Sequence, residues 1–123
     1  MVFAIGDNDY SAKVLMDTYN VNQMDIFTQW EDANGITHRD VYRKKVSGTF
    51  DMQISSISEY QSFIQDVQGH MQNGGYVSCK VAVNNLNVEN VQKDLFIDYA
   101  PIRTRNSNYT KGYMSFTVTI EER

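Results

Sequence analysis

Hydrophobic and polar residues alternate along several segments of this chain, which is the pattern of β-strands that bury one face. The residues between the hydrophobic positions are mostly serine, threonine and other polar types. We therefore expect these segments to be strands that cover one shared core. The inward positions are Val46, Phe50, Met52 and Ile54 in the first segment, Val77, Cys79, Val81 and Val83 in the second, and Met114, Phe116, Val118 and Ile120 in the last.

Three further segments are also expected to be strands, at residues 11–19, 22–31 and 91–99. The first two are separated by Asn20-Val21-Asn22, which is a turn-like sequence. Within the second of them, four residues alternate on one face of the predicted strand. They are Met24, Ile26, Thr28 and Trp30.

Two glycines have expected roles in the strand that covers residues 37–54. Ala33-Asn34-Gly35 precedes it, and Asn-Gly is the preferred pair for a two-residue type I′ hairpin turn. The chain is therefore expected to double back there. Gly48 falls at an inward position within the strand, which indicates a β-bulge or a close approach of another backbone segment.

One well-capped helix is predicted between Ser56 and Gly69. Ser56 and Glu59 have capping-box spacing, in which the serine hydroxyl accepts from the Glu59 N–H and the glutamate reaches back. Gly69 is expected to end the helix in a left-handed conformation. The apolar face has helical spacing and consists of Ile57, Tyr60, Phe63, Ile64 and Val67.

The fold class that follows is mainly β (α+β). We expect an antiparallel six-stranded sandwich or partly open barrel, with one α-helix inserted after the third strand. With 123 residues, no repeat and no linker composition, the chain is expected to form a single domain over residues 1–123. Residues 1–10 are polar after a short apolar start, and we expect them to form a flexible or assembly-dependent N-terminal arm.

The composition narrows the classes of partner that the chain is expected to bind. The net charge of −4 argues against nucleic acid as the general partner, because phosphate binding requires a basic surface. Cys79 is the one cysteine, so neither an internal disulfide nor a thiolate metal cage is expected. The apolar start is too short for a signal peptide, and no segment is long enough to span a bilayer. We expect synthesis in the cytoplasm and no membrane partner.

The sequence predicts no catalytic, cofactor or metal site, and we expect a protein that is not an enzyme. His38 and His70 lack ligand spacing with carboxylates and are interpreted as surface residues. Asp7-Asn8-Asp9 resembles the start of a calcium loop, but the later ligands are missing. Neither a Gly-x-Ser-x-Gly elbow nor a glycine-rich phosphate loop occurs.

A basic cluster is the main charge asymmetry of this acidic chain. On a regular strand Arg39, Arg43 and Lys45 would share one face, next to Lys44. One interpretation is a solvated strand face that discourages edge aggregation. The other is a surface that meets an acidic patch on a neighbouring subunit. Binding to DNA ranks third. The available acidic residues include Asp17, Asp25, Glu31, Glu121 and Glu122.

Tyrosine is abundant, with eight in the chain, and four are expected to be exposed or half-exposed from parity or loop position. Exposed tyrosines are enriched at subunit interfaces and also line sugar-binding sites, so this feature leaves both interpretations open. The four are Tyr42, Tyr76, Tyr109 and Tyr113.

Residues 34–52 resemble small tail structural proteins of tailed phages and prophages, of the tail-tube or baseplate-associated type. In those proteins a turn (here Asn34-Gly35) leads into an Arg/Lys-rich strand (residues 39–45), before a Ser-Gly-Thr-Phe-Asp-Met segment (47–52). A short helix with a Tyr-x-x-Phe face follows, here Tyr60 to Phe63. Three more strands end with an aromatic and a glutamate, here residues 111–121, so the resemblance covers residues 15–122.

The resemblance implies a non-enzymatic virion structural protein. Such a protein assembles as a homo-oligomeric ring or tube, or joins neighbouring tail or baseplate proteins, and nucleic acid would only pass through a tube lumen. The implied location is the virion tail, after synthesis in the host bacterial cytoplasm. In a closed ring, one patch meets a different patch on the next copy. The expected interface residues are Arg39, Tyr42, Arg43, Lys44, Lys45, Tyr113, Glu121 and Glu122.

A second hypothesis comes from a different functional class. The chain would then be a β-sandwich recognition module that binds a glycan or a host protein through its exposed tyrosines. Binding that is lost when Tyr109 or Tyr113 is replaced by alanine would distinguish this hypothesis from the first.

Overall fold

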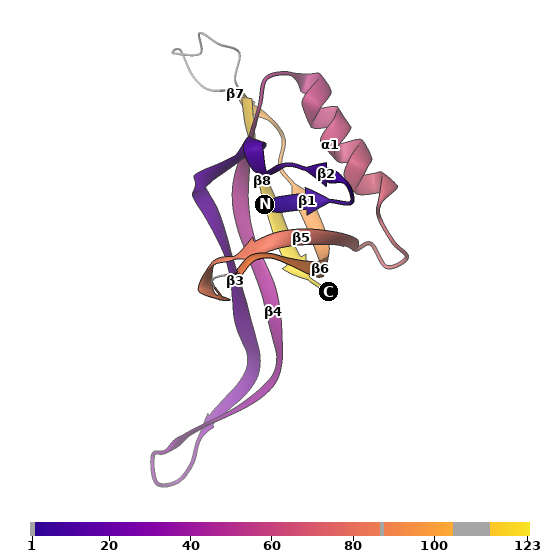
Figure 1. Cartoon of the computed structure of the whole chain (residues 1–123). Helices are drawn as coiled ribbons and strands as arrows, with labels where there is room; N and C mark the ends of the chain where they lie inside the picture. The colour runs from indigo at the N-terminus through magenta and orange to yellow at the C-terminus, as the bar shows by residue number, and fades with distance from the viewer. Residues whose placement is uncertain (1, 87, 105–113) are drawn as a thin grey trace.

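The computed structural model describes residues 2–86, 88–104 and 114–123. It contains one α-helix and an eight-stranded sheet in which every pair of strands is antiparallel (Figure 1). The mainly β class with one helix is therefore confirmed. The strands are β1 (Phe3–Ile5), β2 (Asn8–Asp9), β3 (Val14–Glu31), β4 (Thr37–Ile54), β5 (Val77–Val83), β6 (Val88–Tyr99), β7 (Arg103–Thr104) and β8 (Met114–Glu122). The helix is α1 (Ile57–Gly69), and two short 3-10 turns are η1 (Ser11–Lys13) and η2 (Asn84–Leu86).

The sheet is open, and its strand order is β2-β1-β5-β6-β8-β4-β3, with β7 beside β8. It curls so that its two ends face each other over the core. The ring centroids of Phe3 in β1 and Phe50 in β4 are 5.0 Å apart, although these strands are not neighbours. The Tyr19 hydroxyl of β3 donates to the Ala82 carbonyl of β5 across the same gap. This arrangement is sandwich-like without a second sheet.

The expected count of six strands differs from the observed eight. The segments predicted as two strands at 11–19 and 22–31 are one strand, β3, preceded by η1. Val21, expected in a turn, is fully buried and pairs with Gly48. The extra residues of β3 instead form a register irregularity between Leu15 and Asn20.

Residues 3–5 do not form the expected N-terminal arm. They form β1, which pairs with β5 and is paired on its other side with the two-residue β2. Phe3 and Ile5 are fully buried in the core. A three-residue apolar run is enough for a strand here because both faces of β1 are covered, so no alternation of polar residues marks it.

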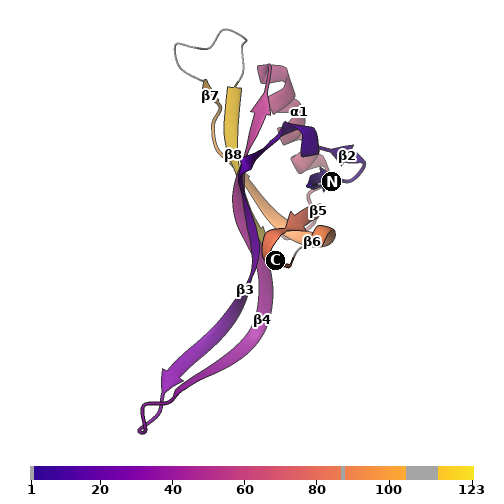
Figure 2. The same ribbon diagram turned by 60° about the vertical axis from the view of Figure 1, so that its left-hand side comes forward.

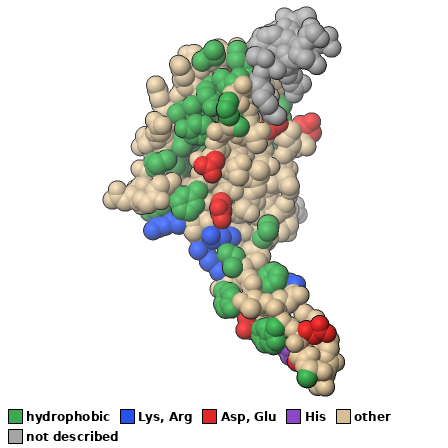
Figure 3. Space-filling view, turned by 180° about the vertical axis from the view of Figure 1, so that it is seen from behind, with side chains coloured by type: hydrophobic (Ala, Val, Ile, Leu, Met, Phe, Trp, Pro, Cys, Tyr) green, Lys and Arg blue, Asp and Glu red, His purple; other side chains and the backbone are tan. Residues whose placement is uncertain are grey.

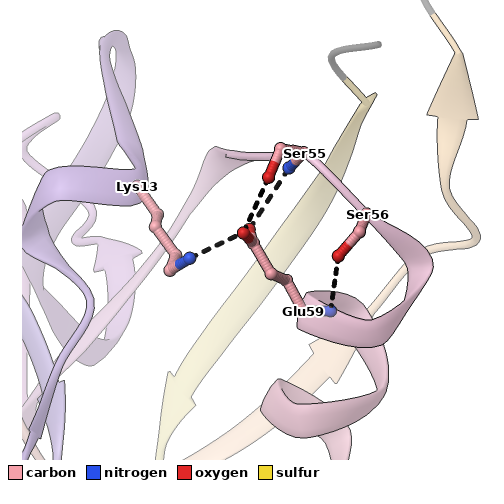
Figure 4. A network of polar contacts seen from close by, with 4 residues as sticks. All are labelled: Lys13, Ser55, Ser56 and Glu59. Atoms are coloured by element: carbon pink, nitrogen blue, oxygen red, sulfur yellow. Dashed lines mark hydrogen bonds and ion pairs between the residues drawn. The ribbon is translucent and has the colours of Figure 1, made fainter.

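The helix α1 begins as the capping-box spacing predicts. Ser56 Oγ accepts from Glu59 N at 3.3 Å (Figure 4). The Glu59 carboxylate reaches back one residue further than expected, to the N–H and hydroxyl of Ser55, and it also binds Lys13 Nζ at 2.9 Å. Phe63 and Val67 enter the core. Gly69 is the last helical residue and is not among the glycines with positive φ, so its expected left-handed stop is wrong.

Candidate assembly surface

A two-stranded arm projects from the body of the molecule (Figures 1 and 2). It exists because β3 and β4 are each 18 residues long, whereas β8 pairs with β4 only from Ser47 to Ile54. We define the arm as residues 24–45, beginning at the paired Met24 and Lys45. Among the described residues, the ladder between β3 and β4 is the only one that the arm makes.

The tip of the arm is a three-residue loop and not the predicted two-residue type I′ turn. Gly35 N donates to the Asp32 carbonyl, and Asp32 N donates to the Ile36 carbonyl, so Ala33 and Asn34 are the central turn residues. Gly35 follows them with φ of 79°. This is the combination of a turn and a left-handed residue that is common in three-residue hairpin loops.

The Asp32 side chain holds the tip together. Its Oδ1 accepts from the backbone N–H groups of Asn34 and Ile36, and its Oδ2 lies 2.8 Å from His38 Nε2. The hydrogen bond from His38, with those from the backbone, lowers the pKa of the Asp32 carboxyl below its usual range. His38 is therefore a surface residue, as predicted, with a structural contact to the loop.

A bulge in the middle of the arm changes which residues share a face. Ile26 pairs with Arg43, and Phe27 pairs with Val41, so Tyr42 is an extra residue in β4. Because successive residues of β3 point to opposite faces, the partners Arg43 and Val41 also lie on opposite faces. Arg39 shares the face of Val41. The expectation that Arg39 and Arg43 line one face is therefore wrong.

The outer face of the arm, which continues the face of the sheet opposite the core, exposes several large apolar side chains. It carries Met24, Ile26, Trp30 and Tyr42, whose exposed fractions are 59%, 40%, 47% and 68%. The Trp30 ring stacks on His38 with centroids 5.3 Å apart, and the Tyr42 and Thr28 hydroxyls share a hydrogen bond. Figure 3 shows hydrophobic side chains spaced along the arm. The predicted alternation of Met24, Ile26, Thr28 and Trp30 on one face agrees with the register of β3.

The inner face of the arm has a different character, because a cation covers its aromatic ring. The Arg39 guanidinium lies 4.0 Å from the centroid of Phe27 and donates twice to Gln29 Oε1. Cation–π contacts of this kind satisfy the ring face and hold the arginine stem in place. Arg39 therefore has partners within its own arm.

The basic residues at the root of the arm are paired inside the chain. Arg43 lies 3.6 Å from Glu122, and Lys45 lies 3.8 Å from Glu121. Glu122 also accepts from Val46 N and lies 3.8 Å from Lys93. The sequence suggested these glutamates as partners on a neighbouring subunit, but they are partners within one copy. Among the described residues, Lys44 makes no ion pair.

An open cavity of about 550 Å³ lies beside this root. Its walls carry three cations and two carboxylates, so its charge is mixed and does not select an anion or a cation. The lining residues are Arg43, Gln92, Lys93, Asp94, Glu122 and Arg123.

The predicted tyrosine surface is only partly described. Tyr42 is the strongly exposed one, and Tyr76 is half-buried with the Arg123 guanidinium 4.2 Å from its ring centroid. Tyr109 and Tyr113 lie outside the described residues, so the interface role predicted for Tyr113 stays a prediction. Within the described part of the chain, the tyrosines do not form one exposed cluster.

Chemically reactive arrangements are few in the part of the chain that the structure describes. No three His, Cys, Asp or Glu side chains there are grouped to hold a metal ion. Asp66 has several partners: it accepts from the Tyr10 hydroxyl and Asn8 Nδ2 and lies 2.9 Å from His70 Nδ1. These contacts fix β2 and η1 to the end of α1. In the described ranges no helix is long and apolar enough to cross a membrane.

Comparisons with known proteins give no match, either to a protein-family model or to a curated protein. The resemblance to phage tail proteins therefore stays a prediction.

The arm itself was missed from the sequence, although a signal for it exists. The predicted strand over residues 37–54 is twice as long as β8, so half of it cannot pair with β8.

Proposed function

We propose that this chain is a non-enzymatic structural component of a phage or prophage tail, which assembles with further copies of itself or with neighbouring tail or baseplate proteins. Two lines of support combine. The sequence from residue 15 to residue 122 resembles small tail structural proteins. The fold supplies a rigid body and a projecting arm, which are suited to joining subunits.

The single observation that carries the proposal is the arm with its exposed apolar side chains. A two-stranded hairpin is marginally stable in water unless other elements pack on it. Residues 24–45 nevertheless expose Met24, Trp30 and Tyr42 on one face, which the body of the same molecule does not cover. Exposed apolar patches of this kind mark interaction sites in natural proteins.

The proposed location can be tested by mass spectrometry of purified tail particles from the organism that encodes the chain. The chain should be present in them at a fixed ratio to the other tail proteins. Its absence from intact particles would contradict the tail role.

The proposed assembly can be tested with the purified chain. Negative-stain microscopy at high protein concentration should show rings, tubes or other ordered oligomers. A matched variant replaces residues 25–44 by Asn-Gly, which fits as a two-residue turn between the paired Met24 and Lys45. This variant should keep the circular dichroism spectrum of a folded β protein and lose assembly. Equal assembly by both proteins would show that the arm is not the assembly element.

A further inference from the structure

The outer face of β3 and β4 changes composition where the arm leaves the body. In the body, this face is mostly polar: it carries Asn20, Asn22, Ser47, Thr49, Asp51 and Gln53, with the half-buried Leu15 beside Asp51. On the arm, the same face carries the four exposed residues Met24, Ile26, Trp30 and Tyr42. The run of large, exposed apolar residues on this face therefore lies in the segment that no other element of the described chain covers.

Charge is also distributed unevenly along the arm. The basic residues of the outer face, Arg43 and Lys45, lie at the root. The acidic residues Asp32 and Asp40 lie near the tip, where Asp40 shares the outer face with Thr28. The outer face of the arm is thus basic toward the root, at Arg43 and Lys45, and acidic further out, at Asp40 and Asp32, beside the apolar side chains of β3.

We propose that the outer face of the arm binds the outer face of the same arm in a second copy of this chain, with the two arms antiparallel. The proposal deepens the assembly function proposed above and rests on it. In this arrangement, the acidic tip of each arm meets the basic root of the other. Trp30 of one copy then lies opposite Met24 of the other, and Asp40 lies opposite Arg43, because Thr28 pairs with Asp40 and Ile26 pairs with Arg43. A parallel arrangement would instead bring the basic roots of the two arms together.

Pairing through the strand edges fits the charges less well than this face-to-face packing. An antiparallel β3–β3 edge contact centred on Thr28 would place Glu31 opposite Asp25. The corresponding β4–β4 contact would place Arg39 opposite Arg43. Like charges directly opposite one another in a ladder are destabilising. Stacked sheet faces avoid these pairs, because they pack roughly 10 Å apart through their side chains.

The size of the face predicts a weak contact. From Met24 to Asp32 the strand advances about 27 Å, at roughly 3.4 Å per residue, and a two-stranded ribbon is about 10 Å wide. The face therefore supplies a few hundred Å² per copy, below the roughly 800 Å² of a standard stable interface. Self-association should accordingly appear only at high protein concentration.

Sedimentation velocity of the whole chain, from about 10 μM to about 1 mM, tests the proposal in a range suited to weak contacts. The outer-face variant Ile26→Thr/Trp30→Thr should weaken dimerisation at least about tenfold, because central aromatic anchors dominate interfaces. The inner-face control Phe27→Thr/Val41→Thr removes equally exposed apolar residues and should leave dimerisation unchanged. Threonine is chosen because it keeps strand propensity. Equal effects of both variants, or no effect of either, would overturn the proposal.

A charge exchange tests the antiparallel arrangement. Asp40→Lys and Arg43→Asp should each dimerise more weakly than the wild type, because each homodimer brings like charges together twice. An equimolar mixture of the two should recover dimerisation, because both contacts in the mixed dimer pair opposite charges. Circular dichroism of each variant checks that the change at Arg43, which also pairs with Glu122, leaves the fold intact.

Loss of dimerisation without recovery in the mixture would overturn the antiparallel contact. A wild-type chain that is monomeric throughout the concentration range would overturn the proposal, and a different protein would then be the partner of the arm. Neither result bears on whether the chain is present in tail particles, so the two proposals fail separately.

Discussion

The backbone of Gly48 packs directly against that of Val21, because a β-carbon at position 48 would lie only 2.6 Å from the Val21 Cα and closer still to the Asn20 carbonyl oxygen. This contact lies where β3 resumes its regular pairing with β4 after the irregularity that ends at Asn20. Any side chain at position 48 would therefore force the two strands apart at the core.

Gly48→Ala is expected to lower the free energy of unfolding by about 3 kcal/mol or more, since backbone atoms cannot move aside as a flexible side chain can. Urea denaturation measures this change. Gly69→Ala is the matched control. A β-carbon there meets nothing within 4 Å, so the change should be smaller than about 1 kcal/mol. Similar stability of the two variants would contradict the close contact.

The contacts of Glu59 predict a stability that depends on acid pH. The hydrogen bonds from Lys13 and Ser55 lower the pKa of the Glu59 carboxyl in the folded state. A lowered folded pKa adds stability above the pKa of the unfolded chain, and this stability is lost as the pH falls through the folded value. Glu59→Gln should therefore destabilise the protein at neutral pH by about 0.5–1 kcal/mol, and the deficit should shrink below about pH 4.

Ser56→Ala separates capping from charge. It removes the acceptor for Glu59 N and should lower the free energy of unfolding by about 1 kcal/mol. This loss should stay the same as Glu59 titrates. Chemical denaturation of both variants at several pH values checks the two expectations. A Glu59→Gln deficit that stays constant into acid would show that the ionised carboxylate is not the source of the stability.

Tyr19 predicts a loss of stability at alkaline pH. Burial raises the pKa of its hydroxyl to about 12. A raised folded pKa gives stability that is fully present below the unfolded value of about 10 and is lost as the pH rises through the folded value. The free energy of unfolding should therefore fall between about pH 10 and pH 12, and it should fall less steeply for Tyr19→Phe.

The free energy of unfolding of the Tyr19→Phe variant should still fall somewhat at alkaline pH. Burial and the hydrogen bond to Asp66 raise the pKa of Tyr10 as well. Tyrosinate absorbance during the same titration shows how many tyrosine hydroxyls ionise above the ordinary pKa of about 10. An unchanged slope in Tyr19→Phe would contradict the assignment.

Cys79 is expected to be unreactive in the folded protein. It is 1% exposed, and burial, with smaller contributions from Asp66 and Asp94, raises its thiol pKa to about 12. Thiolate is the reactive form, so a thiol reagent at about pH 8 should label the chain only after unfolding. Labelling of the native protein as fast as of the denatured protein would contradict this burial. Cys79→Ala is the blank for the assay.

The sequence predicted the strands that alternate and the start of the helix. Phe50, Met52 and Ile54 are buried as expected, and so are Val77 and Val81. These positions could be predicted because a strand with one covered face imposes a period of two on its own residues. The helix start at Ser56 could be predicted because an N-cap needs only groups within one helical turn.

The sequence did not predict features that depend on distant partners. Val21 was interpreted as part of a turn because asparagines flank it, whereas the missing side chain of Gly48 on another strand lets it continue β3. β1 was missed because its partner β5 lies far away in the chain. The arm residues were assigned to one face because a bulge at Tyr42 leaves no mark in the alternation of residue types.

The strand order sets the sequence of folding events. β3 and β4 are joined by a short loop and can pair at little entropic cost, whereas β1 must wait for β5. β8 is the last strand in the sequence, yet it inserts between β6 and β4. Until it does, both of those neighbours present unpaired edges that a second unfolded chain can occupy. Refolding yield should therefore fall as the protein concentration rises, because insertion of β8 competes with aggregation.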